Sequence, residues 1–501
     1  MLSTVPLFRS RSIPFPAQFS ALLALLLGAS IASGCSSGMP MSMVPPPPPG
    51  PTTVPLLLSS TANDKLVQFQ LSIVSITLTD KSGHSVPLYS NANLGPGAVG
   101  ATEFMHLNGV SEPLVTASIP QGTYSMASVI VGFCDFTNAF DDSMGGLTIS
   151  TYAEGLCGQG TGNTTVNLPS PIAISSSPMA LSLNLQVPQS YTLNGMGASA
   201  TYTISPVFTL SPVPISSRPA NNQNGKVTGI NAQITSINTS GNGFIVKTGD
   251  GFSLNVKSDN NTVYQGVAGF STLAAGTLVN MDLAIQPDAS LLATRIEVDD
   301  LAAPSTTIGP LQSPTSNPGQ FVTFLLEGVG CTTYPSPSLR CDGLLAYDTK
   351  TIFSVSGQLG NLQSLPFAAS FSGASFFPGQ NISVFSAGLP ASGSFATAST
   401  ITLAPQSLNG TVTAVSTIGA FNVYTVALAG YDLIPILQVS LAPANRLPSP
   451  GTVVVYADAN TQLLNSTSIG IGSVLRFRGL LFNDNGSLRM DCAQINDGVP
   501  E

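Results

Sequence analysis

Residues 65–80 read KLVQFQLSIVSITLTD, and their apolar side chains alternate with polar ones, first at Val67, Phe69, Leu71 and Ile73 and then at Val74, Ile76 and Leu78. Alternation with a period of two predicts a half-buried strand. The one-residue change of phase after Ile73 predicts a β-bulge. Further strands are predicted at 123–133, 181–187 and 200–210, with turn-rich segments between them. This pattern predicts an all-β domain that resembles a β-sandwich over residues 60–212.

The composition agrees with a folded β protein that works outside the cytoplasm. The chain of 501 residues contains 48 Gly and 39 Pro, which leaves little room for long helices. Charged residues make up only 8 %, against about 25 % in ordinary soluble proteins. The hydrophobic content of 43 % is too high for a disordered chain. Ser, Thr, Asn and Gln must therefore cover the surface, which is typical of secreted proteins.

The charge balance excludes nucleic acid as a partner. The formal net charge is −9, and it would be −11 without residues 1–34, whose only charges are Arg9 and Arg11. An acidic chain without clusters of Lys or Arg lacks the positive surface that neutralises phosphates.

The N-terminal segment has the order of a secretory signal. Arg9 and Arg11 are followed by an apolar run over residues 19–32, and the small residues Ser33 and Gly34 precede Cys35. The apolar run is shorter than the roughly 20 residues that span a bilayer. Residues 1–34 are therefore predicted to be a signal peptide.

The sequence Ala32-Ser33-Gly34-Cys35 resembles the bacterial lipobox. The resemblance implies lipidation of the Cys35 thiol, cleavage before it and acylation of the new amino terminus. Two or three acyl chains anchor a protein stably where one is marginal. The expected location is the cell envelope, and Ser36 in place of Asp favours the outer membrane by analogy with enterobacterial sorting. A plain secretory signal with an incidental cysteine is the alternative.

Residues 34–38 also match the Gly-x-Ser-x-Gly pattern of serine hydrolases, but the context argues against that interpretation. A nucleophile elbow needs a preceding strand and a following helix. Here the low-complexity sequence 36–51 follows, which includes Pro45–Pro49. Residues 35–59 are instead predicted to be a Pro-rich tether, extended at about 3.1 Å per residue.

Three stretches of the sandwich-like domain, LSIVSITLTDKSG, EFMHLNGVSEPL and IPQGTYSMASV, resemble an uncharacterised domain family of bacterial surface lipoproteins. The resemblance covers residues 60–212. It implies a location and no activity.

Beyond a linker at 211–224, the chain contains a weak internal repeat, predicted at 225–303, 318–405 and 406–497. Shared signals include Thr-x-(Tyr/Leu/Phe) at Thr262, Thr461 and Thr351, and a Gly-x-x-Val-like strand after Gly276, Gly472 and Gly379. The pattern resembles a second uncharacterised bacterial family with OB-like barrels, and small β-barrels are expected. The middle unit is the most divergent, and generic β-patterning is the alternative to duplication.

Five cysteines remain after Cys35. In an oxidising compartment near neighbours are the natural disulfide partners, which gives Cys134–Cys157 and Cys331–Cys341. Cys492 is left over on the last predicted strand as a buried thiol. No Cys-x-x-Cys spacing suggests a metal site.

Calcium is the only cofactor that the sequence suggests. Asp135, Asp141, Asp142 and Glu154 cluster in the Cys134–Cys157 loop region and could supply the hard oxygen ligands that Ca²⁺ prefers. The spacing matches no EF-hand, and such loops are common solvated turns, so the default expectation is no cofactor.

The sequence favours a non-enzymatic protein. The chain has two histidines, His84 and His106, and neither belongs to a catalytic motif. We therefore expect a lipid-anchored scaffold or interaction module with an envelope protein or polysaccharide as partner. An adhesin or glycan-binding module is the first alternative. A hydrolase that depends on His106 or Asp142 is the second.

Overall fold

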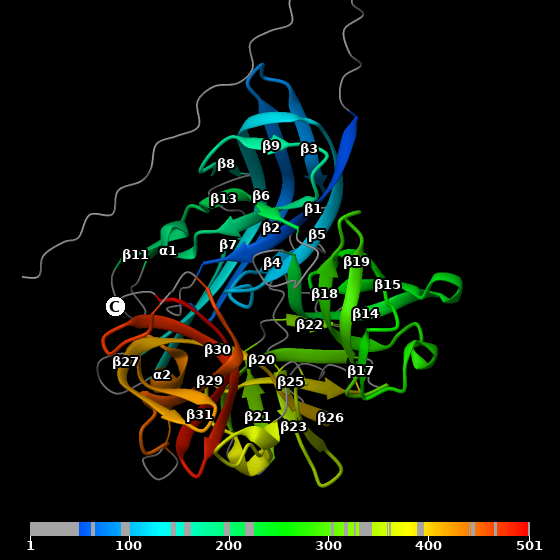
Figure 1. Cartoon of the computed structure of the whole chain (residues 1–501). Coiled ribbons are helices and arrows are strands. Elements are labelled where there is room, and N and C mark those ends of the chain that lie inside the picture. Colours follow the sequence, from blue (N-terminus) through cyan, green and yellow to red (C-terminus); the bar gives the residue numbers. More distant parts are fainter. Residues whose placement is uncertain are drawn as a thin grey trace, which may run out of the picture. The chain divides into compact units, whose positions relative to one another are not determined.

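The structure is a computed structural model that describes residues 50–61, 66–91, 101–141, 147–154, 162–194, 201–215, 225–301, 305–314, 319–324, 327–329, 343–357, 359, 362–387, 395–439, 441, 446–464 and 468–498. Residues Pro49–Glu501 form one compact unit. Within the described ranges this unit is mostly β-strand with two short α-helices, so the all-β prediction is confirmed (Figure 1).

The first module is one hydrogen-bonded sheet of eleven strands in the order β3-β2-β6-β8-β13-β10-β1-β5, to which β4 adds on β2, and β7 and β9 add on β6. The strands are β1 (Pro51–Ser60), β2 (Gln68–Asp80), β3 (Ser85–Ser90), β4 (Ala101–Glu103), β5 (Ser111–Pro120), β6 (Gly122–Asp141), β7 (Leu147–Glu154), β8 (Gly162–Asn167), β9 (Ile172–Ile174), β10 (Met179–Leu185) and β13 (Phe208–Pro214). Helix α1 (Val187–Ser190) and the hairpin β11 (Tyr191–Asn194) and β12 (Thr201–Ile204) precede β13.

The sheet encloses a single core, as expected of a sandwich-like domain. Ile73 of β2, Val129 of β6, Leu58 of β1 and Leu183 of β10 belong to one buried cluster, and the terminal strands β3 and β5 contact each other. The predicted bulge is confirmed, because the register between β2 and β6 shifts on both sides of Ile73. The shift lets both phases of the apolar pattern reach the core.

The predicted tether extends too far along the chain. Strand β1 begins at Pro51 and pairs with both β5 and β10. The apolar side chains of residues 54–58 overrode the proline signal, because they are needed in the core. Pairing with β10 starts at Leu56, directly after Pro55, which has no N–H to donate to a second neighbour.

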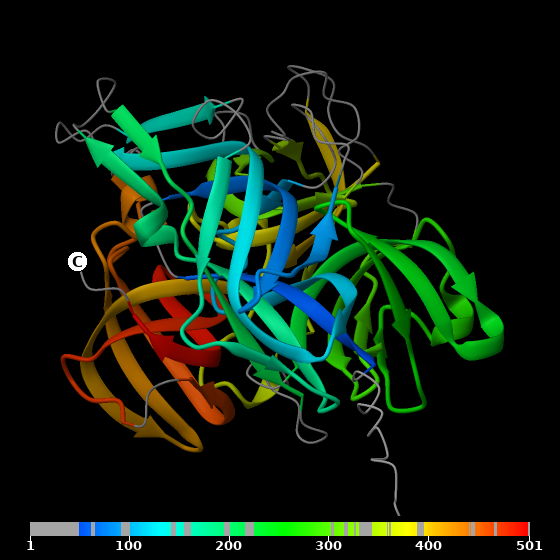
Figure 2. The ribbon, with the colours of Figure 1, turned by 90° about the horizontal axis from the view of Figure 1, so that it is seen from above.

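Three five-stranded barrels follow, and they share one topology. In each, the first strand pairs antiparallel with the second and the fourth, the second pairs with the third, and the third runs parallel to the fifth. This is the closed five-stranded arrangement of an OB-like barrel. Figure 2 shows the curved strands of the third barrel in orange and red. The expectation of barrel repeats, including the divergent middle one, is confirmed.

The five barrel strands have these bounds. The first barrel contains β14 (Lys226–Asn238), β15 (Gly243–Thr248), β16 (Ser253–Lys257), β18 (Leu278–Ile285) and β19 (Leu291–Glu297), and the second contains β20 (Ser305–Pro314), β21 (Gln320–Thr323), β23 (Gly343–Ala346), β25 (Asn381–Ser386) and β26 (Ala396–Leu403). The third contains β27 (Gln406–Ile418), β28 (Phe421–Leu428), β29 (Thr452–Leu463), β30 (Val474–Asp484) and β31 (Ser487–Asp497). The additional elements are β17 (Val263–Gln265), β22 (Glu327–Val329), β24 (Ile352–Val355), α2 (Leu433–Val439) and the 3₁₀ turns Thr239–Gly241, Phe270–Thr272, Leu362–Ser364 and Gly373–Ser375.

The second barrel begins earlier than predicted. Its first strand, β20, lies before residue 318, in a stretch read as a connection between units. Gly309, Pro310 and Pro314 gave that stretch a turn-like composition. Pairing with β25 places Ile308 and Leu311 in buried positions nevertheless.

Candidate functional site

Most of the predicted cysteine chemistry lies outside the described residues, namely Cys35, Cys157, Cys331 and Cys341. Cys134 is buried on β6 and is disulfide-bonded. Its partner is not among the described residues, so the pairing with Cys157 stays a prediction. Cys492 is confirmed as a buried free thiol, whose pKa is raised by burial.

The calcium candidates are spread along a hairpin. Asp135 and Asp141 lie six residues apart on β6, which corresponds to about 20 Å along a strand. Glu154 of β7 pairs with Cys134 and so lies at the Asp135 end, while Asp142 is outside the described residues. The strand therefore does not bring Asp135 and Asp141 together. Among the described residues, no group of His, Cys, Asp and Glu is found that could hold a metal ion.

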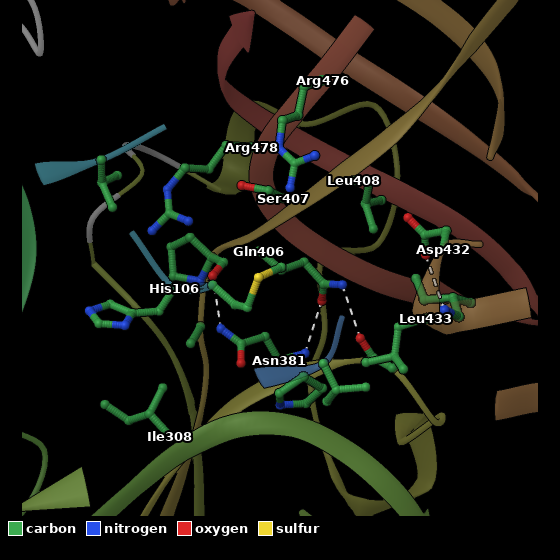
Figure 3. Close-up of a pocket in the computed structure, with 18 of the residues that line it drawn as sticks. His106, Ile308, Asn381, Gln406, Ser407, Leu408, Asp432, Leu433, Arg476 and Arg478 are labelled. Carbon is green, nitrogen blue, oxygen red and sulfur yellow. Dashed lines mark hydrogen bonds between the residues drawn. The ribbon is translucent and has the colours of Figure 1, made fainter. Parts of the chain in front are cut away.

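A pocket with a cavity of about 160 Å³ is lined by residues of the first sheet and of all three barrels (Figure 3). The lining includes Val67 and His106 from the first module, Asn231 from β14, Ile308 and Asn381 from the second barrel, and Gln406, Ser407, Leu433, Arg476 and Arg478 from the third. The notebook-free sequence motifs described above single out only His106 of this set.

His106 forms one wall and is held by two buried carboxylates. Its Nδ1 lies 3.3 Å from Glu103 Oε2, and its Nε2 lies 3.5 Å from Glu112 Oε2. Glu103 also accepts hydrogen bonds from the backbone N–H groups of Phe69, Met105 and His106, each at 2.9 Å. The carboxylate therefore fixes the loop after β4 and positions the imidazole. This arrangement agrees with the structural role expected for His106.

The junction of the second and third barrels forms another wall. Gln406 Oε1 accepts a hydrogen bond from Asn381 N at 2.9 Å, and Gln406 Nε2 donates to Gly379 O at 3.0 Å. Asn381 Nδ2 donates to Pro405 O at 2.9 Å. These bonds hold the connection between β26 and β27 against the start of β25 and leave little freedom between the two barrels.

Two arginines of β30 form the third wall, and the sequence analysis missed them. Phe477 lies between them and is fully buried in the core of its barrel. Because side chains alternate along a strand, Arg476 and Arg478 point to the opposite face. Figure 3 shows both guanidinium groups projecting from β30 into the pocket. The available signal was the Arg-Phe-Arg alternation in a chain with only 15 Lys and Arg.

The electrostatics of the pocket are dominated by these cations. Burial, followed by the positive charge of Arg476, lowers the pKa of Arg478 to about 10. The guanidinium remains charged at neutral pH. Together with the neighbouring amides and the Ser407 hydroxyl, it makes the pocket suited to binding rather than to proton transfer.

The sequence matches no protein-family model and no curated protein. The resemblances to surface-lipoprotein and OB-like families therefore remain expectations. Among the helices of the described residues, none has the length and apolar character needed to cross a membrane.

Proposed function

We propose that the protein is a lipid-anchored component of the bacterial cell envelope that acts as a non-catalytic scaffold or interaction module. The observation that carries the proposal is the order of parts in the chain: a lipobox-like sequence ending at Cys35, a Pro-rich segment, and one compact unit with three barrels of identical topology. Successive copies of one barrel multiply the surface available for partners.

Lipidation is tested by incorporation of radiolabelled palmitate, followed by membrane fractionation. The wild-type chain and a Ser36→Ala control should be labelled and found in the membrane fraction, with the outer membrane expected. Cys35→Ala should lose both properties. Equal labelling of Cys35→Ala and wild type, or a wild type without label, would refute the anchor.

The non-catalytic assignment is supported by the surroundings of His106, because both ring nitrogens face carboxylates. A general base needs a ring nitrogen within reach of its substrate. Hydrolysis of a panel of ester and glycoside substrates by wild type, His106→Ala and Asp142→Ala checks this point. Turnover that either substitution abolishes would favour the hydrolase alternative.

Polysaccharide binding is the second candidate, and a groove on the first barrel favours it. A groove of about 760 Å³ follows β15 and β16 and the turns at 238 and 286–290, and Pro113, Val115 and Thr116 of β5 form its other side. OB-like barrels bind oligosaccharides on this face. Ser253, Asn255 and Lys257 are exposed there and offer hydrogen-bonding groups.

A glycan array on the chain from Pro49 tests this second candidate. If the groove binds polysaccharide, Asn255→Ala and Lys257→Ala should weaken binding, whereas Asn422→Ala should not. Asn422 is similarly exposed on the second strand of the third barrel. Binding that is equally sensitive to all three substitutions, or absent from wild type, would remove the groove as a glycan site.

A further inference from the structure

The shared topology of the barrels allows one position to be compared three times. It is the residue of the fourth strand that precedes a register shift, together with its partner on the fifth strand. The three pairs are Asp282 with Arg295, Phe385 with Thr400, and Arg478 with Gln494. The first pair is an ion pair and the second is neutral. The third contains a cation without an acid opposite it.

Arg295 shows how the first barrel neutralises its cation. Its Nε donates to Asp282 Oδ2 at 3.0 Å, and its Nη1 donates to Glu297 Oε2 at 2.6 Å. The carboxylates more than offset the effect of burial, so the pKa of Arg295 is raised. In the third barrel Gln494 occupies the place of Arg295, and no carboxylate replaces Asp282.

Within the part of the chain that the structure describes, no hydrogen bond or ion pair of the Arg478 guanidinium is found. Asp282 is the acid that acts on it electrostatically. Both Asp282 oxygens are already bound, Oδ2 by Arg295 Nε and Oδ1 by Gly229 N at 3.0 Å. Arg476, two residues earlier on the same face of β30, adds further positive charge.

An enclosed cation without a counterion is unfavourable in a folded protein. Part of the Arg478 surface remains accessible because it faces the cavity, and protein surrounds its other sides. An anion in the cavity would remove the imbalance. A carboxylate fits this role because its two oxygens match the two parallel N–H groups of a guanidinium.

The remaining lining determines the rest of the ligand. Val67, Ile308, Leu408 and Leu433 present apolar surface to the cavity. Its volume of about 160 Å³ is close to that of a cavity of about 150 Å³ that holds benzene. His106 lines the pocket and contacts Glu103 and Glu112, which are not part of the lining. Asp432 lines the pocket but accepts a hydrogen bond from Ile434 N at 3.0 Å.

We propose that this pocket binds a small organic carboxylate of about the size of benzoate. Arg478 pairs with the carboxylate, Arg476 adds attraction, and the apolar side chains contact the body of the ligand. This inference goes beyond the proposed function and does not depend on lipid anchoring or on glycan binding.

Isothermal titration of the purified full-length chain with benzoate and hexanoate tests the proposal, with benzamide and inorganic phosphate as comparison probes. Benzoate or hexanoate should bind saturably, and benzamide, which has the shape of benzoate without its charge, at least 10-fold more weakly. Arg478→Gln should weaken carboxylate binding about 10- to 100-fold, the effect of losing a charge-assisted hydrogen bond. Lys81→Gln removes an equal charge from an exposed turn and should bind like wild type.

A second measurement separates ligand binding from a purely structural role of Arg478. Without ligand, Arg478→Met should unfold at the same temperature as wild type or higher, because it removes an unneutralised cation. A lower unfolding temperature of Arg478→Met together with unchanged carboxylate affinity of Arg478→Lys would contradict the proposal. So would equal affinities for benzoate and benzamide, binding of phosphate alone, or no saturable binding of either carboxylate.

Discussion

At the scale of single residues, an Asp-x-x-Thr turn occurs once in each barrel. The threonine Oγ1 accepts a hydrogen bond from the aspartate N–H at 2.9–3.0 Å and donates one to a carbonyl of the fifth strand at 2.7–2.8 Å. The turns are Asp259–Thr262, Asp348–Thr351 and Asp458–Thr461, and the carbonyls belong to Ala293, Ala398 and Cys492. This turn explains why threonine recurred in the sequence repeat.

Replacing the threonine should destabilise the protein through the loss of both bonds. Thr262 is buried, so Thr262→Val leaves the Ala293 carbonyl and the Asp259 N–H without this partner. We expect a loss of about 1–3 kcal/mol in the free energy of unfolding, measured by urea denaturation. Thr262→Ser keeps the hydroxyl and should lose less than half as much. Equal losses for both variants would show that the methyl group is what matters.

Asp299 makes a pH-dependent contribution to stability. It accepts a hydrogen bond from Thr402 of the second barrel. Burial, followed by the charge of Glu297, raises its pKa from 3.8 to about 6. The folded protein thus holds this proton more tightly than the unfolded chain, and the stabilising contribution is lost as the pH rises from about 4 to about 6.

Asp299→Asn should remove this loss. At pH 8 the variant should be more stable than wild type by on the order of 1–2 kcal/mol, and the difference should vanish near pH 4. Denaturation curves at several pH values measure it. Asp288→Asn serves as the control of opposite sign, since hydrogen bonds from Ser290 lower the pKa of Asp288. A pH-independent difference for Asp299→Asn would contradict the assignment.

At the scale of elements, the fourth strand of every barrel shifts its register against the fifth. The shifts follow Asp282, Phe385 and Arg478. Gly479 occupies the position after the shift in the third barrel. A Cβ at this residue would lie 2.0 Å from Asp491 O and 2.9 Å from Cys492 Cα. The close approach of β30 and β31 at this point therefore requires glycine.

Gly479→Ala should disrupt the third barrel. The clash involves backbone atoms that have to move, so we expect a loss of at least about 2 kcal/mol by chemical denaturation. Gly451→Ala is the matched control at the start of β29, where a Cβ would meet no atom within 4 Å. A Gly479→Ala variant as stable as Gly451→Ala would mean that the strands can separate there without cost.

The elements that sequence patterns predicted best are those in which alternation is long. The bulge after Ile73 could be read directly, because one face of β2 must stay buried on both sides of it. Strands β1 and β20 were missed, since Pro55 and Pro310 suggested a tether and a linker. Their place in a sheet depends on partners, Leu181 for Leu56 and Asn381 for Pro310, that lie far away in the sequence.

At the scale of the whole molecule, Glu297 links the first barrel to the second. Besides Arg295, it accepts hydrogen bonds from Ser356 Oγ at 3.2 Å and from Gly357 N at 2.8 Å. The side chain is buried. One carboxylate therefore neutralises Arg295 and also satisfies the backbone of the next barrel.

Glu297→Gln should weaken this link. Loss of the charge leaves Arg295 with Asp282 as its remaining carboxylate, and we expect a decrease of about 2–3 kcal/mol in unfolding free energy. Asp484→Asn breaks the more exposed Arg489–Asp484 pair and should change stability by less than about 1 kcal/mol. Calorimetry would show a lower main transition for Glu297→Gln only. Similar shifts for both variants would argue against a special role of Glu297.

The sequence by itself determined the all-β class, the barrel repeat, the bulge in β2 and the buried thiol of Cys492. These features follow from local alternation and from residue types that behave alike in most folds. The pocket was decided only by the tertiary structure. Its walls come from residues as far apart as Val67 and Arg478, and the unbalanced charge of Arg478 appears only when Gln494, rather than an acid, lies opposite it. Alternation predicts which face of a strand a side chain occupies, but not what covers that face.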